Sequence, residues 1–233
     1  MNDISVFRQE QKYVVSCETA AKLKERLSCV LKCDSNAESG AYIVRSLYFD
    51  TVENSDFFTK LAGTENRRKI RLRTYGKSGS PTKLELKEKC GAAQKKTSVV
   101  LSQNEARALL LGNYSVLVEH HKESSAAVRL NALLRCGLYR PRVLMEYSRT
   151  AFVHPVGNTR ITFDSNLSKS ESNLDFFADV PLTPVFCGRT VLEVKFSRNL
   201  PVFVSELLSQ FCLTQEAMSK YCNSRKIFYD FSY

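Results

Sequence analysis

Six segments of the chain alternate apolar and charged residues with a period of two, and this pattern constrains the fold more than any other feature of the sequence. Because successive side chains of a β-strand point to opposite faces, such alternation predicts strands with one apolar and one charged face. In segment 68–75, Ile70 and Leu72 share one face, whereas Arg71 and Arg73 share the other. The six segments are 7–15, 68–75, 83–89, 142–152, 159–164 and 190–196, and segment 42–51 is a further strand candidate because it is rich in β-forming residues.

Helices are predicted between these strands. Ser102 and Glu105 have the spacing of a capping box that opens a short helix over 106–111, and Gly112 ends it. Further helices are predicted over 18–33, 123–136, 199–211 and 216–224, and the turn-forming segment 76–82 joins two strands as a hairpin. Because strands often follow strands directly, we expect an α+β fold on an antiparallel sheet. Because no linker or repeat interrupts the chain, we expect a single domain over residues 1–233.

The charged strand faces carry similar groups, mainly arginine and lysine with a few glutamates. An open sheet with one solvated face is one interpretation. The other is a closed barrel or tunnel whose charged side chains point inward, with the helices packed outside. Burying many cations is costly unless water and a polyanion fill the interior. The carboxylates among the cations then fit ligands for Mg²⁺ or Mn²⁺, because phosphate chemistry uses such ions held by oxygen atoms.

The charge of the chain is concentrated in one segment. Its 34 basic and 24 acidic residues give a net charge of +10. Residues 67–96 hold eleven basic and two acidic residues, so this segment alone carries +9. Such an excess indicates an anionic partner: a nucleic acid, an anionic membrane surface or a phosphate compound. No run of about 18 apolar residues predicts a membrane-spanning helix, and the first residues have no apolar core of a secretory signal.

The cysteine and histidine pattern does not predict a metal centre of the zinc type. The chain has eight cysteines but no CxxC pair, and its three histidines are distant from the cysteines in sequence. Without a secretory signal, free thiols in a reducing cytoplasm are the expected state. We therefore expect a cytoplasmic protein, with a peripheral position at the inner membrane face, through a partner protein, as an open alternative.

Eight short motifs, in this order along the chain, resemble the VTC domain, a branch of the CYTH or triphosphate tunnel metalloenzyme superfamily. The resemblance runs from about residue 6 to residue 230, and its strength is in the ordered series, since each motif alone is weak. The motifs are Arg8-x-Glu10-x-Lys12-Tyr13, Tyr48-Phe49-Asp50-Thr51, Lys69-Ile70-Arg71-Leu72-Arg73-Thr74-Tyr75-Gly76, Leu84-Glu85-Leu86-Lys87-Glu88-Lys89, Glu146-Tyr147-x-Arg149-x-Ala151-Phe152, Arg160-Ile161-Thr162-Phe163-Asp164, Leu192-Glu193-Val194-Lys195 and Ser219-Lys220-Tyr221-Cys222.

The resemblance implies an antiparallel β-tunnel that synthesises inorganic polyphosphate by transferring the γ-phosphoryl group of ATP to a growing chain. ATP and polyphosphate would be the partners, and Mn²⁺ or Mg²⁺ the cofactor. The catalytic cations carried over from the family are Lys12, Arg71, Arg73, Lys87, Arg149, Arg160 and Lys220. The further substrate-binding residues are Glu10, Glu85, Tyr147, Lys195, Ser219 and one of Lys95 and Lys96. Glu193 is the expected metal ligand.

One departure from the superfamily pattern bears on the reaction. Hydrolytic relatives open with a Glu-x-Glu pair that binds metal, whereas this chain has Glu10-x-Lys12, which favours polymerase over hydrolase. The N-terminal regulatory domain and membrane helices of eukaryotic relatives are not seen, so we expect a stand-alone form of the prokaryotic type. The terminal oxygen of polyphosphate is already an anion, so the reaction needs positioning and charge neutralisation rather than a general base.

Three other functions stay open at this point. A triphosphatase would use the same fold with water as the acceptor. A nucleic-acid-binding module would use the basic segment 67–96 as a contact surface, with Tyr75 as a stacking platform, although few aromatic residues are interleaved there and no nucleic-acid-binding motif is legible. A polyphosphate-binding module without catalysis is the third, and the presence of Glu193 argues against it.

Overall fold

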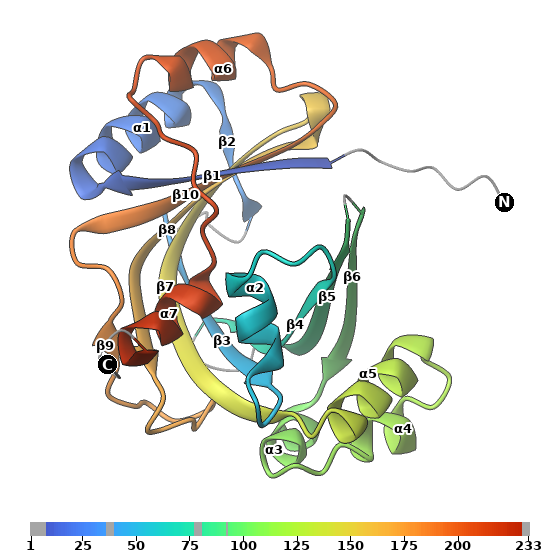
Figure 1. Cartoon of the computed structure of the whole chain (residues 1–233). Coiled ribbons are helices and arrows are strands. Elements are labelled where there is room, and N and C mark those ends of the chain that lie inside the picture. Colours follow the sequence, from blue (N-terminus) through green and yellow to red (C-terminus); the bar gives the residue numbers. More distant parts are fainter. Residues whose placement is uncertain (1–7, 36–39, 77–80, 92, 230–233) are drawn as a thin grey trace, which may run out of the picture. The chain divides into compact units, whose positions relative to one another are not determined.

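The computed structural model describes residues 8–35, 40–76, 81–91 and 93–229, and the chain divides into two compact units (Figure 1). Unit 1 comprises residues 1–43, 147–167 and 184–219, and unit 2 comprises residues 44–146, 168–183 and 220–233. Three long strands, β3 (Tyr42–Asp50), β7 (Arg140–His154) and β8 (Thr159–Ser170), contribute residues to both units. The prediction of a single domain stays a prediction, and each unit is described by itself.

Antiparallel pairing builds the sheet of unit 1. β1 (Arg8–Ser16) pairs with β10 (Arg189–Ser197), and β10 pairs with β8. The short β2 (Lys32–Cys33) pairs with β7. In this register Lys12 is opposite Glu193, and Glu193 is opposite Thr162. Since directly opposite residues of an antiparallel pair point to the same face, the charged residues of three strands share one side of the sheet.

Two helices cover the apolar face of the unit 1 sheet. α1 (Cys17–Val30) begins where the Ser16 side chain accepts a hydrogen bond from the backbone N–H of Thr19. Its buried Leu23 and Leu27 join a core with side chains from β1, β8 and β10 and from α6 (Val202–Ser209). Figure 1 shows α1 and α6 side by side next to β1 and β10. A single 3₁₀ turn, η2 (Val156–Asn158), connects β7 to β8.

The sheet of unit 2 is a run of antiparallel strands in the order β3, β4 (Arg67–Tyr75), β5 (Thr82–Cys90) and β6 (Ala93–Leu101). Its apolar face, with Leu72 and Leu84 fully buried, packs against α3 (Gln103–Leu110), α4 (Val116–His120) and α5 (Ser125–Cys136). The predicted capping box is present: Ser102 and Glu105 exchange side-chain and backbone hydrogen bonds at the start of α3. The two-residue β9 (Thr183–Pro184) pairs with β8.

The remaining helices of unit 2, α2 (Ser55–Leu61) and α7 (Lys220–Tyr229), pack together (Figure 1). Tyr221 of α7 stacks on Tyr48 of β3, and Tyr48 is directly opposite Arg71 of β4. α7 therefore contacts the charged face of the unit 2 sheet, whereas α3, α4 and α5 cover the apolar face. This position differs from the expectation that all helices pack on the apolar side.

The predicted α+β class and antiparallel strands are confirmed, and each of the seven predicted strands occurs within a few residues of its expected bounds, except that β8 continues to Ser170. The helix expected over 18–33 ends at Val30, because β2 follows it. α6 is shorter than the expected helix over 199–211, and the helix expected over 216–224 begins only at Lys220.

Phe7 and residues 77–80 of the expected hairpin turn lie outside the described residues. The cysteines are free thiols, as expected. Among the described residues, no helix is both long and apolar enough to span a membrane.

Candidate active site

Two lysines and two glutamates lie together on the charged face of unit 1, and we call Glu10, Lys12, Glu193 and Lys195 the mixed-charge cluster. β1 and β10 place them side by side, because Glu10 is opposite Lys195 and Lys12 is opposite Glu193. Lys12 Nζ lies 3.2 Å from Glu10 Oε1 and 3.4 Å from Glu193 Oε1. Lys195 Nζ lies 2.7 Å from Glu193 Oε2 and 3.6 Å from Glu10 Oε1. Each lysine is thus shared between both carboxylates.

Both arginines predicted as phosphate ligands in unit 1 have an aspartate partner. Arg149 donates from Nε and Nη2 to the two carboxylate oxygens of Asp164 at 2.6 and 2.7 Å, in a buried bidentate pair. Arg160 Nη2 donates to Asp34 Oδ2 at 2.5 Å. Burial would lower the pKa of Arg149, but Tyr147 and Asp164 outweigh it and raise that pKa above its ordinary value. Arg149 is therefore a permanent cation.

The donor set around Glu193 fits a divalent cation. Thr162 is opposite Glu193 in the β8–β10 pair, is 1% exposed, and among the described residues its Oγ1 has no hydrogen-bond partner. The carboxylates of Glu10 and Glu193 and this hydroxyl are oxygen donors of the kind that Mg²⁺ and Mn²⁺ prefer, and such ions commonly combine one or two carboxylates with substrate phosphates. No group of three or more His, Cys, Asp or Glu residues in the described part of the chain could hold a metal ion, so phosphate oxygens would have to complete the coordination.

Arg71, Arg73, Glu85 and Lys96 form a second group in unit 2, which we call the cationic cluster. Arg71 donates from Nε to Glu85 Oε2 at 2.8 Å, Arg73 Nη1 lies 3.7 Å from the same oxygen, and Lys96 pairs with Glu85 Oε1. Burial would raise the pKa of Glu85, which is 2% exposed, but the charges of Arg71, Arg73 and Lys96 hold it at about 2. Glu85 is therefore an anion throughout the physiological range.

The strand register of unit 2 shows which of the two neighbouring lysines, Lys95 and Lys96, lies on the charged face. Lys87 is opposite Lys69 on β4 and opposite Lys96 on β6, so these three lysines form a row next to Arg71. Lys95 is opposite Glu88 and points to the other side. Lys96, rather than Lys95, thus shares the charged face with Arg71 and Lys87. Lys87 itself is exposed.

Ser219 and Lys220 lie at the boundary between the two units in sequence. In unit 1, the carbonyl of Met218 accepts a hydrogen bond from Lys12 Nζ at 3.5 Å, so the buried Ser219 follows directly on a contact of the mixed-charge cluster. In unit 2, the half-buried Lys220 begins α7, next to the stacked Tyr221. Ser219 is therefore beside the mixed-charge cluster, and Lys220 is next to the ring that stacks on Tyr48.

Asp50, in the Tyr48-Phe49-Asp50 motif, has a structural role that the sequence did not predict. Asp50 accepts hydrogen bonds from the backbone N–H groups of Thr51, Asp56 and Phe57 at 2.7 to 3.0 Å, and also from the hydroxyl of Tyr221. This buried carboxylate thus joins the first turn of α2 to the first turn of α7. Asp34, Asp164 and Thr162 were also given no role. The period-2 face of segment 159–164 could have indicated Thr162 and Asp164, whereas Asp34 follows β2 outside any strand and had no such signal.

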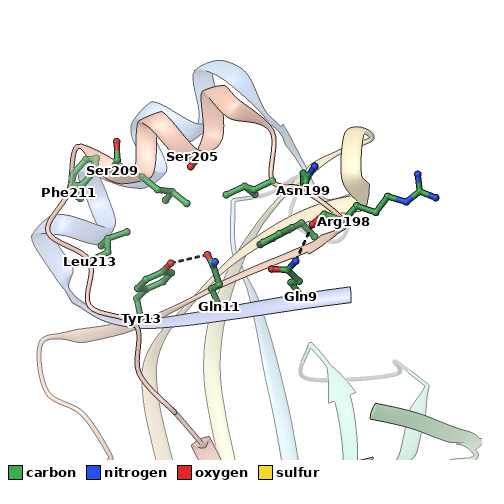
Figure 2. A pocket seen from close by; sticks show the side chains of 12 residues that line it. Gln9, Gln11, Tyr13, Arg198, Asn199, Ser205, Ser209, Phe211 and Leu213 are labelled. Atoms are coloured by element: carbon green, nitrogen blue, oxygen red, sulfur yellow. Dashed lines mark hydrogen bonds between the residues drawn. The ribbon is translucent and has the colours of Figure 1, made fainter. Parts of the chain in front are cut away.

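A cavity of about 520 Å³ in unit 1 is a separate feature (Figure 2). It lies on the opposite face of β1 from Lys12. Gln9, Gln11 and Tyr13 of β1 line one side, and the other side is lined by Ser205, Ser209 and their neighbours on and after α6. Arg198 is the one charged residue of its lining, and Figure 2 shows the guanidinium pointing away from the cavity. Because the lining offers amides, hydroxyls and apolar groups without an inward cation, this cavity does not fit a polyanion.

The two units differ in how completely their cations are balanced. In unit 1 the four predicted cations each contact a carboxylate, in the pairs formed by Lys12 and Lys195 with Glu10 and Glu193, Arg149 with Asp164 and Arg160 with Asp34. In unit 2 Glu85 is the one carboxylate that β4, β5 and β6 present on the face of Arg71, Arg73, Lys87 and Lys96. The excess positive charge of the sequence is therefore a property of the unit 2 face.

Charged strand faces, carboxylate–lysine pairs and an excess of cations on one sheet fit an enzyme that binds phosphate groups. The sequence matches the VTC domain family over residues 7–229, and the chain belongs to that family. The family places it among enzymes of phosphoryl transfer or triphosphate hydrolysis. No protein with a curated description matches the chain in sequence.

Two solved structures share the fold across nearly the whole chain. A candidate adenylate cyclase from Bacillus halodurans is 19% identical, with a TM-score of 0.54, over 97% of this chain and 98% of that one. A candidate adenylyl cyclase from Hippeastrum, described as having a dominant triphosphatase activity, is 15% identical, with a TM-score of 0.56, over 93% and 94%. These similarities confirm the predicted tunnel-type fold.

Proposed function

We propose that this protein synthesises inorganic polyphosphate by transferring the γ-phosphoryl group of ATP to a phosphate chain. The observation that carries the proposal is the unit 2 face, where Arg71, Arg73, Lys87 and Lys96 surround one carboxylate, Glu85. A polymer with a charge on every phosphate is the ligand that such a face suits, because arginine binds phosphate oxygens bidentately and lysine supplies point charges. VTC family membership supports the same substrate class.

In this proposal the cations of both units bind phosphate groups. Lys12, Arg149 and Arg160 of unit 1 and Arg71, Arg73 and Lys87 of unit 2 are the catalytic cations, together with Lys220. The other substrate-binding residues are Glu10, Glu85, Lys96, Tyr147, Lys195 and Ser219; Glu10 and Glu85 act by holding cations in place. Glu193, with Glu10 and Thr162, would hold Mn²⁺ or Mg²⁺. A bound divalent cation would supply charge neutralisation on phosphate oxygens.

The acceptor decides between synthesis and hydrolysis. The end of a phosphate chain is already an anion, so it can attack without losing a proton, whereas water needs activation. Lys12 contacts both carboxylates of its cluster and gives β1 a cation where hydrolytic relatives carry a second metal-binding glutamate. This arrangement favours a phosphate acceptor. It also favours binding of the chain end, because Lys12 adds a positive charge beside Glu193.

The test is an incubation of the purified protein with γ-labelled ATP and Mn²⁺, followed by a gel for polymers and by assays for ADP and free phosphate. A labelled ladder with ADP in excess of free phosphate supports the proposal. Equal ADP and free phosphate without a ladder would identify a triphosphatase instead. Glu25→Gln, at an exposed position of α1 outside both clusters, is the matched control for the charge-neutralising variants described below. Tighter binding of oligonucleotides than of polyphosphate would favour the nucleic-acid-binding alternative.

A further inference from the structure

Tyr48 of β3 lies on the charged face of the unit 2 sheet, and contacts with its neighbours fix its ring. It is directly opposite Arg71 in the β3–β4 pair and is 4% exposed. Its ring stacks on Tyr221, with the centroids 5.2 Å apart and the planes at 24°, and the Arg71 guanidinium lies 5.7 Å from the Tyr48 centroid. Tyr221 is held by its bond to Asp50. The position of the Tyr48 hydroxyl is therefore set by the contacts of the ring with Tyr221 and Arg71.

The Tyr48 hydroxyl oxygen accepts a hydrogen bond, but among the described residues its proton has no acceptor. Arg71 Nη1 donates to the oxygen at 3.0 Å. Within the described part of the chain, no hydrogen bond donated by this hydroxyl is present. Buried tyrosine hydroxyls usually find an acceptor, because an unsatisfied buried donor is costly. The missing partner of Tyr48 is thus a group that the described residues do not supply.

The charges around Tyr48 indicate that this partner is an anion. Burial raises the pKa of Tyr48, but the charges of Arg71, Arg73, Lys69 and Lys220 outweigh it and lower the pKa from its ordinary value of 10. A hydroxyl in such surroundings is a stronger hydrogen-bond donor than a free phenol, and the same cations attract an anionic acceptor.

The two nearby carboxylates are already engaged. Glu85 binds Arg71, Arg73 and Lys96, and Asp50 accepts bonds from the first turn of α2 and from Tyr221. Neither carboxylate therefore takes the Tyr48 proton, which leaves it available to an anion that binds on this face.

We propose that the Tyr48 hydroxyl donates a hydrogen bond to a phosphate oxygen of the substrate, which makes Tyr48 a substrate-binding residue of the cationic cluster. The proposal rests on the proposed function for the identity of the anion, a triphosphate or polyphosphate. The geometry lets Arg71 bind the phosphate and Tyr48 together, so that the phenol orients the guanidinium by accepting from it and binds the phosphate by donating to it.

The test compares tripolyphosphate binding, measured by calorimetry without metal, in the wild type, in Tyr48→Phe and in Tyr114→Phe. Tyr114 is a matched control, since it is equally buried in unit 2 but its hydroxyl already donates to the carbonyl of Tyr139. Tyr48→Phe should weaken binding by roughly tenfold to a hundredfold, the range expected for a hydrogen bond to a charged acceptor. Tyr114→Phe should leave the affinity unchanged.

A second readout follows the phenolate absorbance of the protein as the pH is raised. In the wild type one tyrosine should titrate below the ordinary range, and tripolyphosphate should move that titration to higher pH, because the bound anion disfavours a second negative charge. Tyr48→Phe should lack this step, and Tyr114→Phe should retain it. A merely structural role of Tyr48 would not produce the ligand-dependent shift.

Equal affinity of the wild type and Tyr48→Phe, with no ligand-dependent titration, would overturn the assignment and identify water as the acceptor. No binding of tripolyphosphate to the wild type would overturn both this inference and the proposed function. Binding that depends on Tyr48, in a protein that makes no polymer from ATP, would refute polyphosphate synthesis and leave the role of Tyr48 supported.

Discussion

Glu85→Gln tests whether the carboxylate of the cationic cluster stabilises the empty protein by standing where phosphate would bind. The substitution keeps the shape of the side chain and removes the charge that Arg71, Arg73 and Lys96 share. Two opposite effects should follow. The folded protein should lose stability because three cations are left without their carboxylate, and tripolyphosphate should bind more tightly because the face becomes more positive.

The magnitude follows from the pKa of Glu85. A folded-state pKa of about 2 against the ordinary value of 4.5 corresponds to about 3 kcal/mol of stabilisation, at about 1.4 kcal/mol per tenfold difference. Because the folded-state pKa is the lower one, this stabilisation is complete above pH 4.5 and is lost as the pH falls from 4.5 towards 2. At pH 7, Glu85→Gln should therefore lower the Tm by about 6–12 °C, at about 2–4 °C per kcal/mol for a chain of this length.

The assay is thermal unfolding of the wild type, Glu85→Gln and the exposed control Glu25→Gln between pH 3 and pH 8, with and without tripolyphosphate. The difference between Glu85→Gln and the wild type should be large at pH 7 and should shrink as the pH approaches 3. Saturating tripolyphosphate should stabilise Glu85→Gln more than the wild type, since ligand binding to the folded state adds stability by mass action. A difference that does not change with pH, or a weaker effect of tripolyphosphate on the variant, would refute the reasoning.

Three further predictions concern other carboxylates and Lys12. Glu193→Gln should still bind ATP but should lose the metal-dependent rate by orders of magnitude, measured by ADP release at saturating Mn²⁺; near-normal polymer synthesis would show that Glu193 is only a counter-ion. Burial and the neighbouring Asp50 raise the pKa of Asp56 to about 6. Because the folded-state pKa is the higher one, stability is lost as the pH rises through 6 and the buried carboxyl ionises. The free energy of unfolding of Asp56→Asn should therefore be about 1–3 kcal/mol higher than that of the wild type at pH 8 but not at pH 4. Lys12→Glu should restore a Glu-x-Glu pair and raise the ratio of free phosphate to polymer in the product analysis; an unchanged ratio would separate Lys12 from the choice of acceptor.

The strands and their faces could be predicted from the sequence because their pattern is local. The alternation of Ile70 and Leu72 with Arg71 and Arg73 reports directly which residues enter the core, and the structure buries both leucine and isoleucine completely. β6 was missed because its residues do not alternate in the same way: most of its length is exposed, and Lys95 and Lys96 are adjacent charges on opposite faces. The late start of α7 was missed because it depends on tertiary contacts of Tyr221.

The charged residues of the candidate site could be predicted as a set, but their partners could not. The resemblance to the VTC domain supplied Arg149 and Arg160 as phosphate ligands, whereas their pairing with Asp164 and Asp34 depends on strand pairing and on the loop that carries Asp34. Tyr48 had no sequence signal of its own, because an aromatic residue on a strand is most often part of a core. Only its register against Arg71 and its unused proton give it a chemical role.

The carboxylates that hold the cations also bear on how a growing polymer could leave the residues that bind it. The four predicted cations of unit 1 and several of unit 2 already have a carboxylate partner, so a phosphate must compete with Glu10, Asp164 or Glu85 for the same donors. The net free energy of each contact is then much smaller than that of an arginine–phosphate pair formed from solvated, unpaired groups. For the proposed synthesis this is an advantage, because a chain that is extended at one end must move past its binding residues after each transfer. Many contacts of moderate strength retain the polymer while allowing that movement, whereas a few strong contacts would hold it in place.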